Sequence, residues 1–304
     1  MKKTLISVVG ATAIGKTSLA IALAQHFKTE ILAADSRQFY KEMSIGTAVP
    51  SEEELQSIPH HFIQHKSVQE SYSVGDFEKD ALHLLETLFE SKSVVILVGG
   101  SGLYIDAVTQ GLDDFPKIDP EIRKRLNAQL REHGILKLQE RLSKLDPNYY
   151  EQVDLDNPHR LIRALEVCLG SGQPYSSFIN KKKPKRPFQV VTIGISANRE
   201  IIYERINRRV DMMLEKGLLD EAKSVYRFKE LNALQTVGYK ELFKYLDGEW
   251  ELDFAIAEIK KNTRRFAKRQ LTWFKKNENT IWVDVEDEAS AIAQKVANAI
   301  HTNE

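Results

Sequence analysis

The chain has 304 residues, an apolar fraction of 42% and no net formal charge at pH 7. These values exclude a disordered or fibrous protein and allow one large domain or two modest ones. The basic start at residues 1–3 is followed by no small-residue cleavage site, and no apolar run approaches membrane-spanning length, so we expect neither a signal peptide nor a membrane helix. Cys168 is the only cysteine, which excludes an intrachain disulfide and a cysteine-based zinc site. We therefore expect a cytoplasmic protein.

A phosphate-binding loop stands near the beginning of the chain, after a strand-like run at 5–9. The pattern G-x-x-x-x-G-K-[ST] is matched by Gly10, Ala11, Thr12, Ala13, Ile14, Gly15, Lys16 and Thr17. In this pattern the glycines let successive backbone N–H groups converge on an anion, and the following helix adds its positive N-terminal end. Lys16 supplies a mobile cation and Thr17 a hydroxyl for Mg²⁺. A plain glycine turn between a strand and a helix is the alternative.

Apolar runs alternate with helical patterns along much of the chain. Strand-like runs lie at 5–9, 31–34, 94–98 and 190–195, and helical patterns lie at 73–89 and 201–214. That alternation predicts an α/β fold with a parallel sheet flanked by helices. Between 113 and 187 the patterns are helical only, at 120–133, 135–145 and 158–169. We therefore predict a core of residues 1–112 and 188–304 with an all-helical insertion at 113–187.

Positive charge is concentrated in two segments although the whole chain is neutral. The window 260–276 holds eight Lys and Arg residues and no acid, and a basic linker spans 181–186. On a helix over the first segment, an apolar stripe would pack on the core and a basic stripe would stay exposed, so a polyanion is the natural partner. The apolar stripe consists of Ile259, Phe266 and Trp273, and the basic stripe consists of Arg265, Lys268 and Arg269. The aromatic residues are interpreted as core, and the linker is equally well explained as a solvated loop.

Polar and glycine-rich segments follow two predicted strands, where the ligand crevice of an open α/β sheet lies. Asp35 could hold a metal, accept a proton or cap the next helix. The glycines at 99–102 could allow close approach of a ligand or tight packing of a helix. No Asp or Glu ends the run at 94–98, although a nucleoside-triphosphate hydrolase would usually carry one there. An ATPase is therefore disfavoured, whereas a small-molecule kinase stays open.

Several segments, taken together, resemble the tRNA dimethylallyltransferases. They are the phosphate loop, Asp35–Tyr40, Ile45–Pro50, Gly99–Tyr104, Asn157–Val167, Gln235–Glu241 and Thr263–Phe274. The resemblance spans nearly the whole chain and implies a P-loop core with an inserted helical lobe. It also implies transfer of a dimethylallyl group from dimethylallyl diphosphate to the exocyclic amine of the adenine 3′ of the tRNA anticodon. Eukaryotic relatives add a zinc finger that this sequence lacks, so it resembles the bacterial form.

The resemblance implies roles for individual residues. The phosphate loop would hold the diphosphate, with Mg²⁺ at Thr17, and Asp35 would accept the amine proton. Arg205 and Arg209 would meet the charge on the departing diphosphate. The residues expected to contact tRNA are Asp35, Ser36, Arg37, Gln38, Ser101, Arg123, His159, Arg160, Leu161, Ile162, Arg163, Gly238, Tyr239 and Lys240. A solvated helix face is the alternative for the arginines, and Ser101 stands where the family more often has Thr.

Three other functions are compatible with parts of the sequence. An adenylate isopentenyltransferase would use a free nucleotide as acceptor, a small-molecule kinase would consume ATP, and an RNA-binding module would use the loop for anion binding alone. The basic helix and the helical insertion favour tRNA as acceptor. We expect Mg²⁺ as cofactor, tRNA and dimethylallyl diphosphate as partners, no membrane contact and a monomer. For His60, His61 and His65, a role in a loop is favoured over metal binding.

Overall fold

The computed structural model describes residues 2–179, 181 and 185–302. The chain divides into two compact units, which we call the core unit (Met1–Gln110 and Arg186–Glu304) and the helical unit (Gly111–Lys185). The limits of the helical unit lie two residues before the 113 and 187 expected from the sequence. No helix in the described part of the chain is long and apolar enough to cross a membrane.

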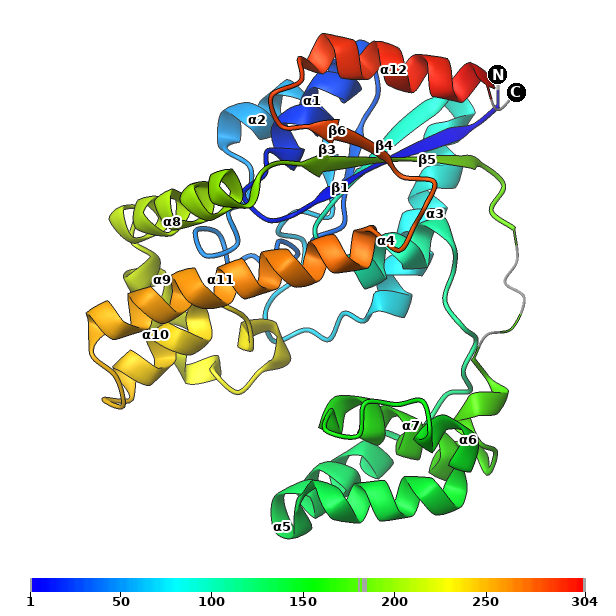
Figure 1. Ribbon diagram of the computed structural model, residues 1–304, viewed down its shortest axis with the longest axis vertical. Helices are drawn as coiled ribbons and strands as arrows, with labels where there is room; N and C mark the ends of the chain where they lie inside the picture. Colours follow the sequence, from blue (N-terminus) through cyan, green and yellow to red (C-terminus); the bar gives the residue numbers. More distant parts are fainter. Residues whose placement is uncertain (1, 180, 182–184, 303–304) are drawn as a thin grey trace. The chain divides into compact units, whose positions relative to one another are not determined.

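The core unit is built on a six-stranded sheet in the order β3-β2-β4-β1-β5-β6, with every neighbouring pair parallel (Figure 1). The strands are β1 (Thr4–Gly10), β2 (Ile31–Ala33), β3 (His60–His61), β4 (Val94–Val98), β5 (Gln189–Ser196) and β6 (Ile281–Asp284). The predicted α/β fold is confirmed. The strands β3 and β6 were not predicted: β3 has only two residues, and β6 is a short IWVD segment without the continuous apolar run that marks β2.

Helices cover both faces of this sheet. They are α1 (Lys16–His26), α2 (Glu52–Ser57), α3 (Val74–Ser91), α4 (Gly102–Thr109), α8 (Arg199–Glu215), α9 (Leu218–Val225), α10 (Tyr239–Leu246), α11 (Leu252–Phe274) and α12 (Ala289–Thr302). Side chains of β1 alternate between the faces: Ile6 and Val8 pack in the cluster that contains α1 and α12, and Leu5 and Val9 in the cluster that contains α3 and α4. The sheet is therefore a buried middle layer, as parallel pairing requires.

The helical unit has a core of its own, made by α5 (Pro120–Leu145), α6 (Pro147–Tyr150) and α7 (Pro158–Ser171). The side chains of Asp119 and Asn157 cap α5 and α7, each directly before a proline, which is favoured at the first helical position. Within α5 the backbone is not helical at Gly134 (φ 72°), between the two helices predicted from the sequence. A left-handed φ is open to glycine at little cost, so the helix bends there.

The chain re-enters the core unit at Arg186, the last residue of the predicted basic linker. Its guanidinium donates to Glu78 at 2.5 Å and also to the carbonyl of Ala107. Arg186 is largely buried, so it anchors the linker and is not a solvated residue. Residues 182–184 of the linker lie outside the described residues.

His65 lies among aromatic side chains of the core unit. Its ring centroid is 5.5 Å from that of Phe39, 5.6 Å from that of Phe62 and 5.0 Å from that of Tyr72. Both ring nitrogens are buried without a hydrogen-bond partner in the described structure. Burial, with a smaller effect of the Lys66 charge, lowers the pKa of His65 below its usual value. The cluster therefore accommodates a neutral ring.

This burial predicts a loss of stability in acid. Because the pKa of His65 is lower in the folded than in the unfolded chain, the unfolded chain takes up the proton first as the pH falls through about 6.5. We expect the free energy of unfolding to fall between pH 7.5 and pH 5.5, and His65→Phe to reduce that fall. Urea unfolding at both pH values measures this free energy, and the control is His83→Gln, because His83 is exposed. An equal fall in wild type and His65→Phe would contradict the prediction.

Candidate active site

A cavity of about 620 Å³ lies in the core unit, where the chain leaves β1, β2 and β4. Thr12 follows β1, residues 35–37 follow β2 and residues 100–104 follow β4. The other walls come from residues 46–47, α8, the start of α9, α11, and residues 235–238 and 240. The sequence-predicted residues that line this cavity are Thr12, Asp35, Ser36, Arg37, Ser101, Arg209, Gly238 and Lys240. Parallel pairing thus brings segments far apart in the sequence to one site.

The phosphate loop has the shape of an anion cradle. Ala13 and Gly15 have left-handed φ values of 63° and 106°, and α1 begins at the next residue with no side chain capping its N-terminus. Backbone N–H groups in such a conformation form a concave site for an anion. The ammonium of Lys16 folds back over the loop and donates to the carbonyl of Ala11 at 2.8 Å.

Lys16, Asp35 and Arg209 influence one another electrostatically. Burial lowers the pKa of Lys16 to about 8, which the Asp35 carboxylate opposes and the Arg209 charge reinforces. Burial also lowers the pKa of Arg209, while Asp35 raises it. Asp35 and Arg209 line the cavity and Lys16 does not, but the three charges interact. This group contains two cations and one carboxylate, so an added anion would relieve the excess positive charge.

The segment after β2 is held by one local hydrogen bond and by hydrogen bonds to segments that are distant in the sequence. The backbone N–H of Arg37 donates to Asp35 Oδ1 at 3.1 Å, so the carboxylate caps a turn and no helix begins there. This geometry excludes the helix-capping alternative for Asp35. The N–H of Ser36 donates to Ser101 Oγ at 3.1 Å, which connects the segment to the loop after β4. The guanidinium of Arg37 donates to the carbonyls of Asn232 and Ala233.

Gln270 of α11 is a buried residue that the sequence analysis did not select. Its Oε1 accepts from the N–H of Thr12 at 2.8 Å, and its Nε2 donates to the carbonyl of Gly100 at 2.9 Å. One side chain therefore connects α11 to both the phosphate loop and the loop after β4. A signal was present, because Gln270 stands between the buried Ala267 and Phe274, and a polar side chain in a core stripe must be hydrogen-bonded.

The glycines after β4 serve packing of α11. A Cβ on Gly100 would lie 2.4 Å from Gln270 Nε2, and a Cβ on Gly102 would lie 2.4 Å from Trp273 Cδ1. Of the two alternatives left open by the sequence, the structure therefore supports tight packing. The indole N–H of Trp273 also donates to Asp106 at 2.9 Å.

The prediction that Phe266 and Trp273 belong to the core is wrong. All three residues of the apolar stripe line the cavity, but Phe266 and Trp273 are 38% and 37% exposed, whereas Ile259 is buried. A seven-residue spacing drifts by about 20° per heptad on a straight helix, so the stripe turns towards solvent after Ile259. The basic stripe Arg265, Lys268 and Arg269 is exposed, as expected.

The two candidate arginines of α8 have different places. Arg209 lines the cavity, whereas Arg205 is exposed and donates to the carbonyl of Ile14 at 3.1 Å, on the phosphate loop itself.

Two other predicted residues support the walls of the cavity. Tyr239 is fully buried and donates to Glu221 at 2.6 Å, and Gln38 donates to the carbonyls of residues 47 and 48. Their side chains shape the cavity without lining it.

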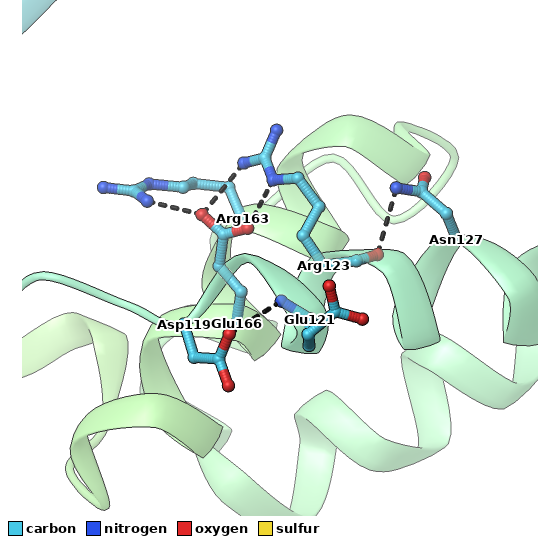
Figure 2. Close-up of polar contacts among 6 residues, drawn as sticks. All are labelled: Asp119, Glu121, Arg123, Asn127, Arg163 and Glu166. Atoms are coloured by element: carbon cyan, nitrogen blue, oxygen red, sulfur yellow. Dashed lines mark hydrogen bonds and ion pairs between the residues drawn. The ribbon is translucent and has the colours of Figure 1, made fainter.

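The remaining predicted residues belong to the helical unit. Arg123 and Arg163 share the carboxylate of Glu166 (Figure 2). His159 and Arg160 are exposed. Leu161 and Ile162 are buried in the core of the unit, so the expectation of RNA contact does not hold for these two side chains. They instead hold the helix that carries their neighbours.

Glu166 is charged despite its burial. Burial raises its pKa, but hydrogen bonds from Arg123 and Arg163 outweigh that effect, so the pKa of Glu166 lies below its usual value. The cluster therefore contains one anion and two cations.

Comparisons with known proteins agree on a family. The family model described as IPP transferase matches residues 38–277. The chain is 59% identical to the tRNA dimethylallyltransferase of Christiangramia forsetii over 302 residues, which cover 99% of this chain and 100% of the relative. It is 58% identical to the tRNA dimethylallyltransferase of Flavobacterium johnsoniae over 307 residues, which cover 99% of each chain.

Solved structures give the same result. The tRNA isopentenylpyrophosphate transferase of Bacillus halodurans has a TM-score of 0.72 and 38% identity, covering 99% of this chain and 96% of that one. The structure of a eukaryotic dimethylallyltransferase acting on tRNA has a TM-score of 0.84 and 27% identity, and the match covers 99% of this chain and 80% of the eukaryotic chain.

The pKa of Lys16 predicts how anion binding depends on pH. Below about 8 the side chain is charged, and above it the ammonium must regain a proton to hold an anion. We expect the affinity for inorganic diphosphate to fall by up to about tenfold per pH unit above 8. Calorimetric titration from pH 7 to 9.5 measures it, with Lys16→Arg as a control that stays charged. The same slope in both proteins would contradict the prediction.

Proposed function

Because the chain belongs to the IPP transferase family, we propose that it transfers a dimethylallyl group from dimethylallyl diphosphate to tRNA. The acceptor is the exocyclic N6 amine of the adenosine 3′ of the anticodon, and the products are N6-isopentenyladenosine and diphosphate. The observation that carries this proposal is the single cavity in which the phosphate-loop residue Thr12, the carboxylate of Asp35 and the guanidinium of Arg209 meet. That set matches an anionic leaving group and a nucleophile that must lose a proton.

In this proposal, named residues assist the bond that breaks, the bond that forms and the proton that is transferred. The bond between the allylic carbon and the diphosphate oxygen breaks, and its electron pair leaves with the diphosphate. The amides of the phosphate loop, Lys16 and Arg209 stabilise that charge, and Arg205 supports the loop from outside. The N6 nitrogen forms the new bond to carbon, and Asp35 accepts its proton. A carboxylate helps here because the lone pair of N6 is delocalised into the ring.

The residues at the loop fit a Mg²⁺ ion carried by the substrate. Among the described residues there is no group of three or more His, Cys, Asp or Glu that could hold a metal. Mg²⁺ keeps several waters and uses few protein ligands when phosphates are present, so the hydroxyl of Thr17 with diphosphate oxygens and waters suffices. When bound, the ion would neutralise part of the diphosphate charge. We propose Mg²⁺ at Thr17 on this basis.

A tRNA acceptor is favoured over a free nucleotide by two features of α11. Its exposed Arg265, Lys268 and Arg269 suit a polyanion, and the exposed rings of Phe266 and Trp273 at the cavity suit an unstacked base. The target adenine must leave the anticodon-loop stack for its amine to meet the allylic carbon. We propose that Ser36, Arg37, Ser101, Gly238 and Lys240, which line the cavity, contact the loop around it.

We also propose that the protein works as a monomer in the cytoplasm. The only cysteine, Cys168, is a buried free thiol, which suits a reducing compartment.

One assay separates this function from its alternatives. Label is followed from dimethylallyl diphosphate with Mg²⁺ into unmodified tRNA, with AMP and ATP present as competing acceptors. Label in tRNA alone is the expected result. Label in free nucleotide would favour an adenylate isopentenyltransferase, and no transfer at all would favour a small-molecule kinase.

Asp35 gives the sharpest test of the proton acceptor. Asp35→Asn and Asp35→Ala should lower turnover by about 10²–10⁴-fold while leaving the affinity for the donor nearly unchanged. The measurement should be made at pH 7, because removal of the carboxylate lowers the pKa of Lys16 further from about 8. Turnover within a factor of about two of wild type would exclude Asp35 as the base.

The basic stripe of α11 predicts a strong salt dependence. Release of counterions from each neutralised phosphate makes the tRNA affinity fall steeply between low and moderate salt. Lys268→Gln should reduce the slope of log affinity against log salt by about one. Filter binding at several salt concentrations tests this, and a flat dependence would contradict it.

A further inference from the structure

One buried carboxylate of the helical unit is shared by arginines from two helices (Figure 2). Glu166 of α7 accepts from Nε and Nη2 of Arg123 on α5 at 2.5 and 2.9 Å, and from Nη1 of Arg163 on α7 at 2.5 Å. Glu166 is 4% exposed, whereas the side chains of Arg123 and Arg163 are 53% and 39% exposed. The anion is therefore covered, and both cations can be reached from solvent.

Arg163 is also fixed from a second direction. Its guanidinium carbon lies 4.7 Å from the ring centroid of Phe115, and that ring stacks on Tyr175 at 5.1 Å with an interplanar angle of 17°. The carboxylate thus orients the guanidinium while the ring supports one face. A side chain held in this way loses little conformational freedom when it binds a ligand.

The contacts with Glu166 leave most donors of the two arginines available for a ligand. Each guanidinium carries five N–H donors in a planar fork. Arg123 uses two hydrogen bonds on Glu166 and Arg163 uses one. The cluster of Arg123, Arg163 and Glu166 keeps a net charge of +1, and its guanidinium forks match the geometry of a phosphate.

The charge of the helical unit is concentrated in its linker. Residues 111–185 hold fourteen Lys and Arg and eleven Asp and Glu, and four of these lysines lie at 181–185. Residues 111–180, which contain the helices, hold ten Lys and Arg and eleven Asp and Glu, so recognition of a polyanion by the helices must depend on where particular arginines are placed. Stability alone is a weak explanation for the cluster, because an apolar contact would hold the two helices at least as well as a buried ion pair.

We infer that Glu166 is a positioning residue for tRNA binding, which sets Arg123 and Arg163 as a pair that contacts the RNA backbone. This inference rests on the proposed function, because the ligand is the tRNA of that reaction. Glu166 itself touches neither tRNA nor the reacting atoms.

The test uses two substitutions that change the charge by the same amount. Glu166→Gln and Glu140→Gln each remove one negative charge from the helical unit, but Glu140 is exposed and pairs with Lys137, away from the arginine pair. Charge alone predicts that both variants bind tRNA as tightly as wild type or more tightly. We expect instead that Glu166→Gln raises the KM for tRNA about tenfold, while the KM for the donor and kcat at saturating tRNA stay unchanged. Glu140→Gln should not raise the KM for tRNA.

A double-mutant cycle shows whether Glu166 acts through its partner. If it does, Glu166→Gln adds little to the loss caused by Arg123→Gln, whereas fully additive losses would overturn the inference. If Glu166→Gln unfolds under assay conditions, Glu166→Asp replaces it, because it keeps the charge and withdraws the carboxylate by one methylene. Its expected loss of tRNA affinity is also several-fold, and wild-type affinity would overturn the inference.

Equilibrium binding of unmodified tRNA without donor keeps the two proposals apart. If wild type binds and modifies tRNA and Glu166→Gln binds it equally well, only the positioning role fails. If wild type neither binds nor modifies tRNA, the proposed function fails, and the positioning role fails with it.

Discussion

The carboxyl ends of β1, β2 and β4 lie at one edge of the sheet because these strands pair in parallel. Val98 is the partner of Val8 on one side and of Ala33 on the other. The phosphate loop, Asp35 and Ser101 leave the sheet directly after these residues, so the register of three strands fixes where cation, carboxylate and hydroxyl stand. Each wall of the cavity is placed relative to that edge, and the proposed chemistry depends on it.

The helix α11 depends on the same edge through Gln270. A buried carboxamide must be hydrogen-bonded, and its two partners are backbone groups of the loops after β1 and β4. Sliding or rotating α11 would break both hydrogen bonds of this buried carboxamide. This constraint sets the rotation of the helix, and with it the exposure of Phe266 and Trp273 at the cavity and of the basic stripe to solvent.

The helical unit handles charge differently from the core unit. In the core unit cations are in excess, because Lys16 and Arg209 face the single carboxylate of Asp35, and this excess favours binding of an anion. In the helical unit two arginines are already paired with a buried carboxylate, and the pairing leaves their outer donors in place. A cradle for a small anion benefits from unbalanced charge, whereas recognition of a shaped polyanion benefits from fixed geometry.

The sequence by itself determined the phosphate loop, four of the strands, the α/β fold, the helical character of 113–187 and the exposure of the basic stripe of α11. Each of these depends on short-range patterns such as strand alternation, helical spacing and turn chemistry. Tertiary structure decided which of Arg205 and Arg209 faces the cavity, that Leu161, Ile162 and Tyr239 are buried, and that Gln270 joins three segments. These facts depend on how each helix is rotated and packed against segments that are distant in the sequence, and short-range patterns do not encode that packing.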